Sequence, residues 1–329
     1  MIVCKFGGSA TANKQAVENV KKLFSNQRVV WVFSAIGKSN KNDIKTTDLL
    51  INYTKHNSNK TKIMQQLITK FKKLCLKTNV DMNITAYINS ICKKFENDGD
   101  KNWFISRGEY LTTQIMAKYL NLKFVPAEKI IFLKNNIIDF AKTEKSIKKL
   151  VLSYKNIAVP GFYAANQIDN DDSEIEPQIK LFSRGGSDYS ACILAKCLGA
   201  SICENWTDVD GIYPINPNLK KSNILQNLSY TDLNIMSKMD ANVIHKNCAS
   251  LLNGTGTILQ VKNIFKIENA GTTVSSTYTQ RAEFVAFKKG KDNCTIIQKL
   301  KNGGSITLKL PSGKFKNGVE FLQKVKKQL

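Results

Sequence analysis

The hydrophobic positions of this chain alternate between short β-like runs and helical repeats. Residues 1–6 (MIVCKF) and 28–36 (RVVWVFSAI) are apolar and rich in β-branched side chains, which predicts two buried strands. Between residues 61 and 95 the apolar side chains recur every three or four positions, which predicts two helices. Shorter apolar runs predict further strands at 122–127, 129–133, 156–164, 179–183 and 200–206.

This order of strands and helices predicts an α/β fold. A mostly parallel open sheet flanked by helices on both faces satisfies it best. Near the C-terminus, two strand-like runs at 293–300 and 305–310 precede a helical pattern at 318–329, which predicts a small α+β appendage. We therefore expect a catalytic domain over residues 1–277 and a short C-terminal region over residues 278–329. The acidic segment 169–176 is expected to form an exposed hairpin or loop.

The composition favours a globular protein and argues against a membrane span, a signal peptide and a Cys/His metal site. A chain of 329 residues with 42% hydrophobic residues can bury a large core. No apolar run is long enough for a membrane span, and the N-terminal run is too short for a signal peptide. The eight cysteines form no CxxC pair and there are only two histidines, so a Cys/His metal site is not expected. Reduced thiols and a cytoplasmic location fit this pattern.

The formal net charge of +23 raises the question of a nucleic-acid partner. The lysines are spread through nearly every segment and accompany many asparagines, instead of forming one basic stripe. Compositional drift explains that distribution, and no zinc-finger or RNP-like motif is present. We expect no nucleic-acid partner, although a basic surface attracts anions in general.

Polar, glycine-containing turns follow several of the predicted strands. Ligands of open α/β sheets bind beyond the carboxyl ends of the strands, so these turns are the candidate sites. The turns KFGGSA (5–10) and SRGGSD (183–188) each open a predicted helix, where free backbone N–H groups can bind an anion. Each glycine pair alone is also explained as a tight strand–helix connection. Two such turns in one sheet, adjoined by Lys5 and Arg184, favour phosphate binding.

Four motifs resemble those of the aspartokinases, in the family's order and spacing. They are KFGGSA (5–10), SRGEYLT (106–112), FSRGGSDYSA (182–191) and ENWTDVDGIY (204–213). The segments 228–248 and 271–274 resemble the family's next helical segment and closing strand. The resemblance covers about residues 1–277 and implies the amino acid kinase fold. It also implies transfer of the γ-phosphoryl group of ATP to the β-carboxylate of L-aspartate.

The resemblance assigns roles to individual residues. The expected catalytic residues are Lys5, Asp188 and Arg184. Arg184 is expected to clamp the α-carboxylate of aspartate, and Asp188 to orient Lys5 or to engage Mg²⁺ through water. The expected ATP-binding residues are Lys5, Gly7, Gly8, Ser9, Gly185, Gly186, Ser187, Thr207, Asp208, Asp210 and Tyr213. The expected aspartate-binding residues are Ser34, Thr47, Glu109 and Arg184. His245 is expected to pack or hydrogen-bond locally.

The resemblance also implies ATP and Mg²⁺ as cofactors, with no metal ligated by the protein alone. The family usually continues into two ACT domains that build a dimer, so residues 278–329 are expected to form at most one shortened ACT-like unit or an unrelated cap. The sequence leaves the oligomeric state open, with a homodimer as one alternative. Two other functions also stay open: another enzyme of the superfamily, or a non-catalytic nucleotide or amino-acid sensor. The chain departs from the family at Asn216–Asn218 and at Asn242, where many members carry a basic residue.

Overall fold

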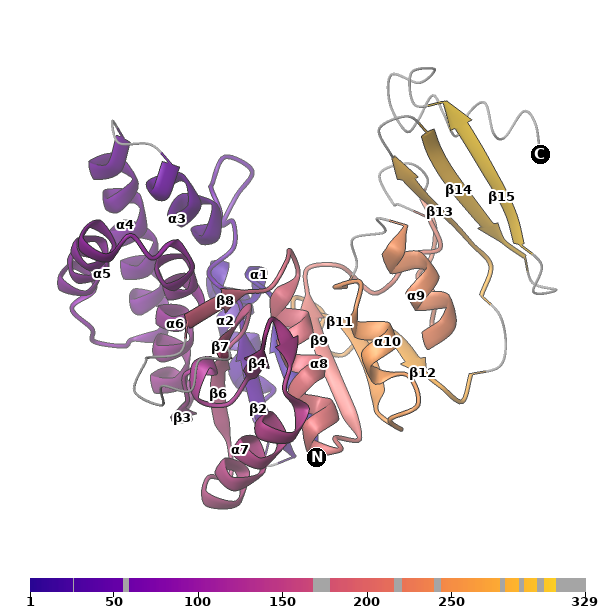
Figure 1. The fold of residues 1–329 in the computed structure, drawn as a ribbon, viewed down its shortest axis with the longest axis horizontal. Helices are drawn as coiled ribbons and strands as arrows, with labels where there is room; N and C mark the ends of the chain where they lie inside the picture. Colours follow the sequence, from indigo (N-terminus) through magenta and orange to yellow (C-terminus); the bar gives the residue numbers. More distant parts are fainter. Residues whose placement is uncertain are drawn as a thin grey trace.

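The computed structural model describes residues 1–25, 27–55, 59–167, 178–215, 221–239, 244–278, 282–289, 293–300 and 305–311. The predicted acidic loop (169–176), the predicted C-terminal helix (318–329) and both departures from the family pattern lie outside these residues. Figure 1 shows a layered body that carries a bundle of helices at one end and a small sheet at the other.

An eight-stranded sheet forms the centre of the body, in the order β10-β12-β11-β9-β1-β2-β6-β3. Every neighbouring pair is parallel except β11 and β12. The strands are β1 (Ile2–Phe6), β2 (Arg28–Phe33), β3 (Lys123–Phe124), β6 (Ile157–Pro160), β9 (Ile202–Thr207), β10 (Asn227–Ser229), β11 (Ile258–Asn263) and β12 (Thr272–Ser275). The predicted mostly parallel sheet is confirmed.

Helices cover both faces of this sheet. They are α1 (Ser9–Ala12), α2 (Lys14–Lys22), α3 (Thr46–Lys55), α4 (Lys60–Thr78), α5 (Ile84–Asp98), α6 (Lys101–Leu120), α7 (Phe140–Ser153), α8 (Gly186–Leu198), α9 (Tyr230–Lys238) and α10 (Cys248–Leu252). Helices α7 to α10 share one hydrophobic core with the sheet, and α2 to α6 share the other. The two helices expected between residues 61 and 95 are confirmed as α4 and α5, whereas α7 and β11 were not predicted.

The alternation of side chains along β1 and β2 builds these two cores. Val3 packs into the core of α8, whereas Cys4 and Phe6 belong to the opposite core. On that opposite face the Phe6 ring stacks on Trp31 and Phe33, with ring centroids 5.4 and 5.2 Å apart. Because successive side chains of a strand point to opposite faces, Lys5 shares the face of Val3 and is directed toward α8.

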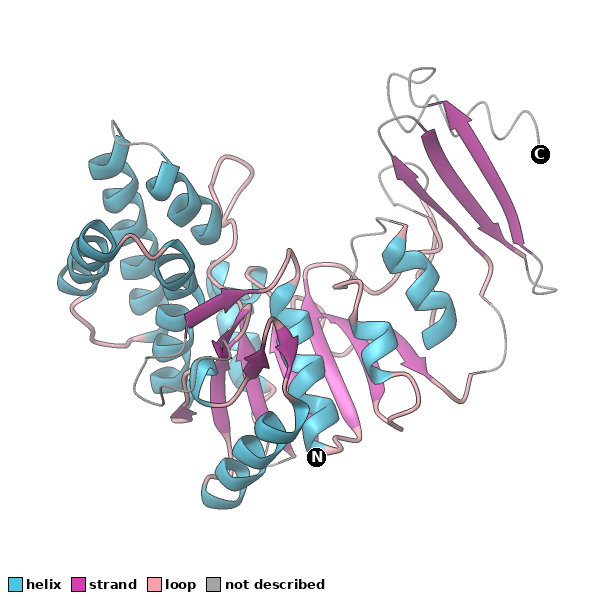
Figure 2. Ribbon diagram, viewed as in Figure 1, coloured by secondary structure: helices cyan, strands magenta, loops and turns pink. Residues whose placement is uncertain are grey.

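Two smaller sheets complete the described structure (Figure 2). The first has the order β5-β4-β7-β8, with β4 (Phe132–Lys134), β5 (Ile137–Ile138), β7 (Tyr163–Gln167) and β8 (Gln178–Leu181). The second is the antiparallel sheet of β13 (Phe284–Lys289), β14 (Asn293–Lys299) and β15 (Ser305–Pro311). The predicted strands near residues 293–300 and 305–310 are therefore confirmed.

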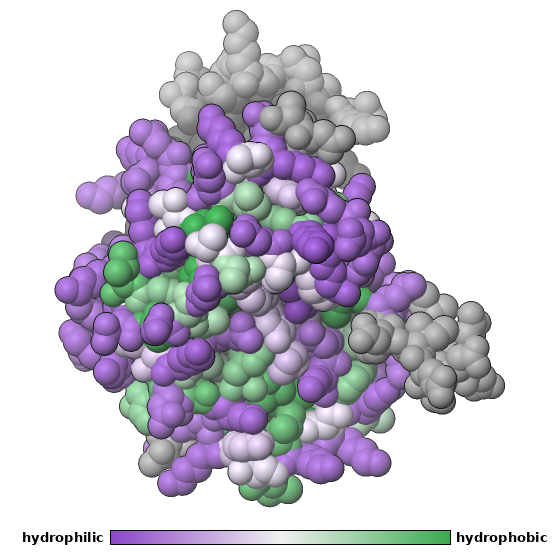
Figure 3. Space-filling model, turned by 90° about the vertical axis from the view of Figure 1, so that its left-hand side faces the viewer, coloured by the Kyte–Doolittle hydropathy of each residue, from purple (hydrophilic) through white to green (hydrophobic). Residues whose placement is uncertain are grey.

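On the face seen in Figure 3, hydrophilic residues predominate toward the outline of the molecule. Hydrophobic residues are exposed between them, nearer the centre of the view. Single exposed apolar side chains such as Leu76 and Leu152 are ordinary on a protein surface. Within the described ranges, none of the helices has both the length and the apolar character needed to span a membrane.

Candidate active site

Lys5 stands near the carboxyl end of the central strand β1. Its ammonium group lies 2.7 Å from the Oδ1 atom of Asp188, which belongs to the first turn of α8. Only 11% of the Lys5 side chain and 9% of the Asp188 side chain are exposed. The alternation along β1 thus brings together two residues 183 positions apart, both expected to be catalytic.

The first glycine turn requires glycine because two loops touch there. The N–H group of Gly37, which follows β2, donates to the carbonyl oxygen of Gly8 at 2.8 Å. A Cβ atom on Gly8 would lie 2.7 Å from the carbonyl oxygen of Ala35, and one on Gly37 would lie 2.6 Å from the Gly8 carbonyl carbon. The N–H group of Gly7 donates to the Trp206 carbonyl oxygen at 2.9 Å, so the turn is also tied to β9. Ser9 begins α1 directly after this turn.

The second glycine turn opens helix α8. Gly185 has a φ of +82°, in the left-handed region that favours glycine. A Cβ atom on Gly186 would lie 2.6 Å from Cβ of Phe182, so this position is also crowded. Gly185 has no side chain to cap the helix, so the first N–H groups of α8 have no side-chain acceptor there. Ser187 lies within this first turn, and Asp188 follows it.

His245 supports the second turn from the segment before α10. Its backbone N–H donates to Oδ2 of Asp188 at 3.2 Å, and its Nε2 atom lies 2.7 Å from the Ser183 hydroxyl. The imidazole ring also stacks on Tyr189 with a centroid separation of 4.9 Å. Burial lowers the pKa of His245, Asp188 opposes this and Lys246 adds to it, so the neutral form is favoured. The predicted local packing of His245 matches these contacts, but its link to Asp188 was not predicted.

Glu109 of α6 is a buried carboxyl group with an unpaired oxygen. It is 3% exposed, and its Oε2 atom has no hydrogen-bond partner among the described residues. Burial raises the pKa of Glu109 to about 8, against the opposing effect of the Ala35 backbone N–H. Such a group needs a cation or a donor to stay ionised at neutral pH.

The other residues expected to bind aspartate differ in their surroundings. Ser34 directly follows β2, and its N–H donates to the Phe6 carbonyl oxygen at 3.0 Å, so it lies beside the first glycine turn. Thr47 is the second residue of α3, next to Thr46. Ser34 and Thr47 are both half-buried, whereas Arg184 is exposed and makes no hydrogen bond or ion pair with the rest of the described structure.

The residues Thr207, Asp208, Asp210 and Tyr213, expected on the nucleotide side, lie at the end of β9 and in the loop after it. Thr207 ends that strand and donates to the exposed Asp208 at 3.2 Å. Asp210 accepts from the Asn263 amide at 2.6 Å and from Lys266 at 2.9 Å, and these two bonds lower its pKa, with Lys266 as the larger cause. Asp210 therefore braces the loop against the end of β11. Tyr213 is half-buried farther along the same loop.

Comparison with known proteins gives a consistent family. A sequence model described as "Amino acid kinase family" matches residues 1–263. The bifunctional aspartokinase/homoserine dehydrogenase of Buchnera aphidicola is 26% identical over 87% of this chain and 38% of its own length. Aspartokinase 3 of Bacillus subtilis is 26% identical over 84% of this chain and 64% of its own length. The chain thus spans less than two thirds of the length of these curated relatives.

Solved structures agree with the sequence comparison. The aspartate kinase of Clostridium acetobutylicum superimposes with a TM-score of 0.78 and 27% identity, over 100% of this chain and 83% of that one. Escherichia coli aspartokinase III in complex with aspartate and ADP has a TM-score of 0.76 and 18% identity, over 90% of this chain and 69% of that one. At 18% identity the second likeness concerns the fold alone.

Proposed function

Because this chain belongs to the amino acid kinase family, we propose that it is an aspartokinase. In this proposal the γ-phosphoryl group of ATP passes to the β-carboxylate of L-aspartate and gives 4-phospho-L-aspartate. The observation that carries the proposal is the ion pair of Lys5 and Asp188, 2.7 Å apart, which joins the end of β1 at the first glycine turn to helix α8 at the second glycine turn. The two turns follow strands of different sheets, β1 and β8, so the expectation that they belong to one sheet is wrong. The likeness to the Clostridium enzyme over the whole chain supports it.

The residue types around Lys5 and Asp188 suit the transfer of a phosphoryl group to a carboxylate. A carboxylate with an ordinary pKa of about 4 is already ionised at neutral pH, so no general base is needed to activate it. The difficulty is to bring two anions together and to stabilise the charge of the transferring phosphoryl group. Lys5 supplies a charge held in place by Asp188, and the uncapped start of α8 supplies backbone N–H donors.

The substrate side of the proposal uses groups that lack a partner. Arg184 is exposed and unpaired among the described residues, so its planar guanidinium group is free to bind the α-carboxylate in a bidentate manner. The unpaired Oε2 atom of Glu109 would accept a hydrogen bond from the α-ammonium group of aspartate. Ser34 and Thr47 would add hydroxyl contacts near the first glycine turn.

The nucleotide side of the proposal comprises the two glycine turns and the loop after β9. Gly8 and Ser9 would donate to phosphate from one side, and Gly185, Gly186 and Ser187 from the other. Gly7 would shape the first turn, because its N–H is already bound to the Trp206 carbonyl oxygen. The loop residues Thr207, Asp208, Asp210 and Tyr213 would line the adenosine. Mg²⁺ carried with ATP would neutralise phosphate charge, and the carboxylates of Asp188 and Asp208 are oxygen ligands of the type it prefers. The described residues contain no group of three or more metal-ligating side chains.

The proposal also includes a domain boundary, a cellular location and an assembly. We place a domain boundary near residue 277, supported by the separate three-stranded sheet of β13 to β15. A cytoplasmic location is supported by the free thiols of the seven cysteines whose side chains the structure describes. A homodimer is the proposed assembly, and light scattering of the purified full chain measures it directly.

The proposed activity is tested with purified protein, Mg-ATP and a panel of amino acids. Trapping with hydroxylamine converts an acyl phosphate into a coloured hydroxamate. We expect signal with L-aspartate and none with L-glutamate or N-acetyl-L-glutamate. Signal with another acid only would indicate a different enzyme of the family. ATP binding without any acyl phosphate would indicate a sensor.

A further inference from the structure

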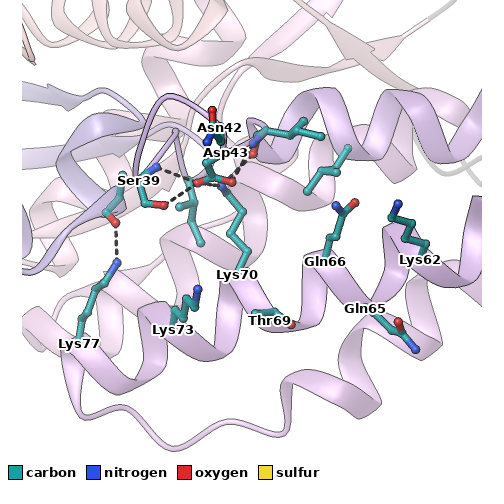
Figure 4. Close-up of a pocket in the computed structure, with 14 residues that line it drawn as sticks. Ser39, Asn42, Asp43, Lys62, Gln65, Gln66, Thr69, Lys70, Lys73 and Lys77 are labelled. Carbon is teal, nitrogen blue, oxygen red and sulfur yellow. Dashed lines mark hydrogen bonds and ion pairs between the residues drawn. The ribbon is translucent and has the colours of Figure 1, made fainter.

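A pocket lies apart from the residues of the candidate active site. It has a volume of about 320 Å³, between helix α4 and the segment that follows β2 (Figure 4). The polar face of α4 lines one side, and Ser39, Asn42 and Asp43 line the other. This volume is at the lower end of the range of small-molecule sites.

Positive charge is concentrated on the α4 side of the pocket. The lysines that line it are Lys62, Lys70, Lys73 and Lys77, whereas Asp43 is the one acidic residue among the lining groups. Lys70, Lys73 and Lys77 follow the i, i+3, i+7 spacing and so share one helix face. Like charges at this spacing repel one another and destabilise the helix. An anion bound between the lysines would reduce this repulsion.

The lysines differ in depth and in how far their charge is satisfied. Lys70 is only 9% exposed, and its ammonium group lies 2.6 Å from Oδ2 of Asp43 and 2.8 Å from the Ile44 carbonyl oxygen. Lys62 and Lys73 are exposed and form neither a hydrogen bond nor an ion pair within the described residues. Burial lowers the pKa of Lys70 and of Lys77, and the charge of Lys73 lowers both further.

We propose that this pocket binds a compact polyanion, a small molecule that carries phosphate or carboxylate groups. Ammonium groups are established binders of such oxygen anions. Gln65, Gln66 and Thr69 line the same pocket and add uncharged hydrogen-bonding groups. The concave shape and the small volume favour a small molecule over a macromolecule.

The pocket adjoins the loops of the candidate active site. Asp43 also accepts from the Ser39 N–H and hydroxyl groups at 2.7 and 2.9 Å, so it orders the segment between Gly37 and Thr46. Gly37 packs on Gly8 at the first glycine turn. An anion bound to the lysines would compete with Asp43 for Lys70. Any effect on aspartate turnover rests on the proposed function, so binding is measured separately.

Calorimetric titration of the full chain with pyrophosphate and with citrate, at low ionic strength and without nucleotide, tests the site. Lys73→Gln should weaken the binding of the preferred anion about tenfold, as expected for one charge-assisted contact. Lys72→Gln is the matched control, because Lys72 is the exposed neighbour on the same helix and does not line the pocket. It should change the dissociation constant less than twofold, which is within the usual screening of a surface charge.

The outcomes separate the pocket from the catalytic site. A loss in Lys73→Gln and in Lys62→Gln, with Lys5→Ala still binding, supports the pocket. Pyrophosphate binding more tightly than citrate identifies phosphate as the ligand chemistry, and the reverse identifies carboxylate. Equal affinities in Lys73→Gln and Lys72→Gln, or no binding of either anion, would overturn the proposal. Melting temperatures of all variants establish that each is folded.

Discussion

Two buried ion pairs lie beside adjacent residues of the central strand β1, one formed by Lys5 itself and the other next to Cys4, and they have different surroundings. The pair of Lys5 and Asp188 lies on the α8 face, at the strand end. On the opposite face, the Glu204 carboxylate of β9 is paired in register with Cys4 and binds Arg28 at 2.9 and 3.0 Å. The first pair lies beside turns that have free donors, whereas the second is surrounded by its own chain.

The hydrogen bonds that the Glu204 carboxylate accepts within the protein indicate a structural role for the second pair. Besides Arg28, its carboxylate accepts from the Trp206 indole N–H at 2.9 Å and from the Cys4 thiol at 3.2 Å. These bonds, first of all those from Arg28, hold the pKa of Glu204 below its usual value despite its burial. A fully satisfied pair is stabilising and has no group left for a ligand. The comparison therefore indicates a structural role for Glu204 and supports the catalytic role that we propose for Lys5.

Glu204→Gln should produce the largest effect on stability. It leaves the guanidinium group of Arg28 without a counter-charge, and breaking a buried pair in this way lowers the free energy of unfolding by about 3 kcal/mol or more. Urea unfolding measures this change. Glu18→Gln is the control, because its pair with Lys14 is exposed and is worth less than about 1 kcal/mol. A loss below the control's would contradict the structural role of Glu204.

Lys5→Met should have the next largest effect, on turnover and not on folding. One preorganised charge on a transferring group is typically worth a hundredfold or more in rate. Asp188 keeps the backbone N–H of His245 as a partner, so the melting temperature should fall less than in Glu204→Gln. Turnover within threefold of the parent, in the hydroxamate assay, would remove Lys5 from the mechanism.

The two pairs also show how far a sequence predicts a site. The apolar run of residues 1–6 predicted a buried strand, and the resemblance implied that Asp188 orients Lys5 or engages Mg²⁺ through water. Glu204 was part of a motif, but its partner Arg28 is 176 residues away and no local pattern connects them. The contact of His245 with Asp188 spans 57 residues and was missed for the same reason. Such long-range contacts depend on how the strands and helices are arranged in space, and the periodicity of hydrophobic residues does not reveal that arrangement.

Arg184→Lys should raise the KM for aspartate about tenfold with a smaller change in kcat, because a point charge cannot reproduce two parallel hydrogen bonds to a carboxylate. Steady-state kinetics at saturating Mg-ATP measure both constants. Lys180→Arg is a suitable control, since Lys180 is an exposed cation of β8. An unchanged KM would mean that the substrate carboxylate binds elsewhere.

The smallest predicted effect is a pH dependence of aspartate binding that originates in Glu109. Its pKa is raised to about 8 by burial, so at neutral pH most of the free enzyme carries the neutral carboxyl group. Only the ionised form pairs with the α-ammonium group of aspartate, so kcat/KM for aspartate should rise with pH and level off above about 8. In the folded protein the raised pKa has the opposite consequence for stability, because the charged form is disfavoured and stability falls as the pH rises toward 8.

Glu109→Gln separates this effect from other titrations. The amide has nearly the same shape but cannot ionise, so the rise of kcat/KM between pH 6 and 8 should disappear and the value should stay near the low-pH limit. Thermal unfolding of the same variant should also lose the decline that the parent shows over this range. Glu128→Gln is the control, because Glu128 lies 3.6 Å from Arg107 and belongs to no part of the proposed site. If Glu109→Gln keeps the pH profile of the parent, another group titrates and the ammonium of aspartate is bound elsewhere.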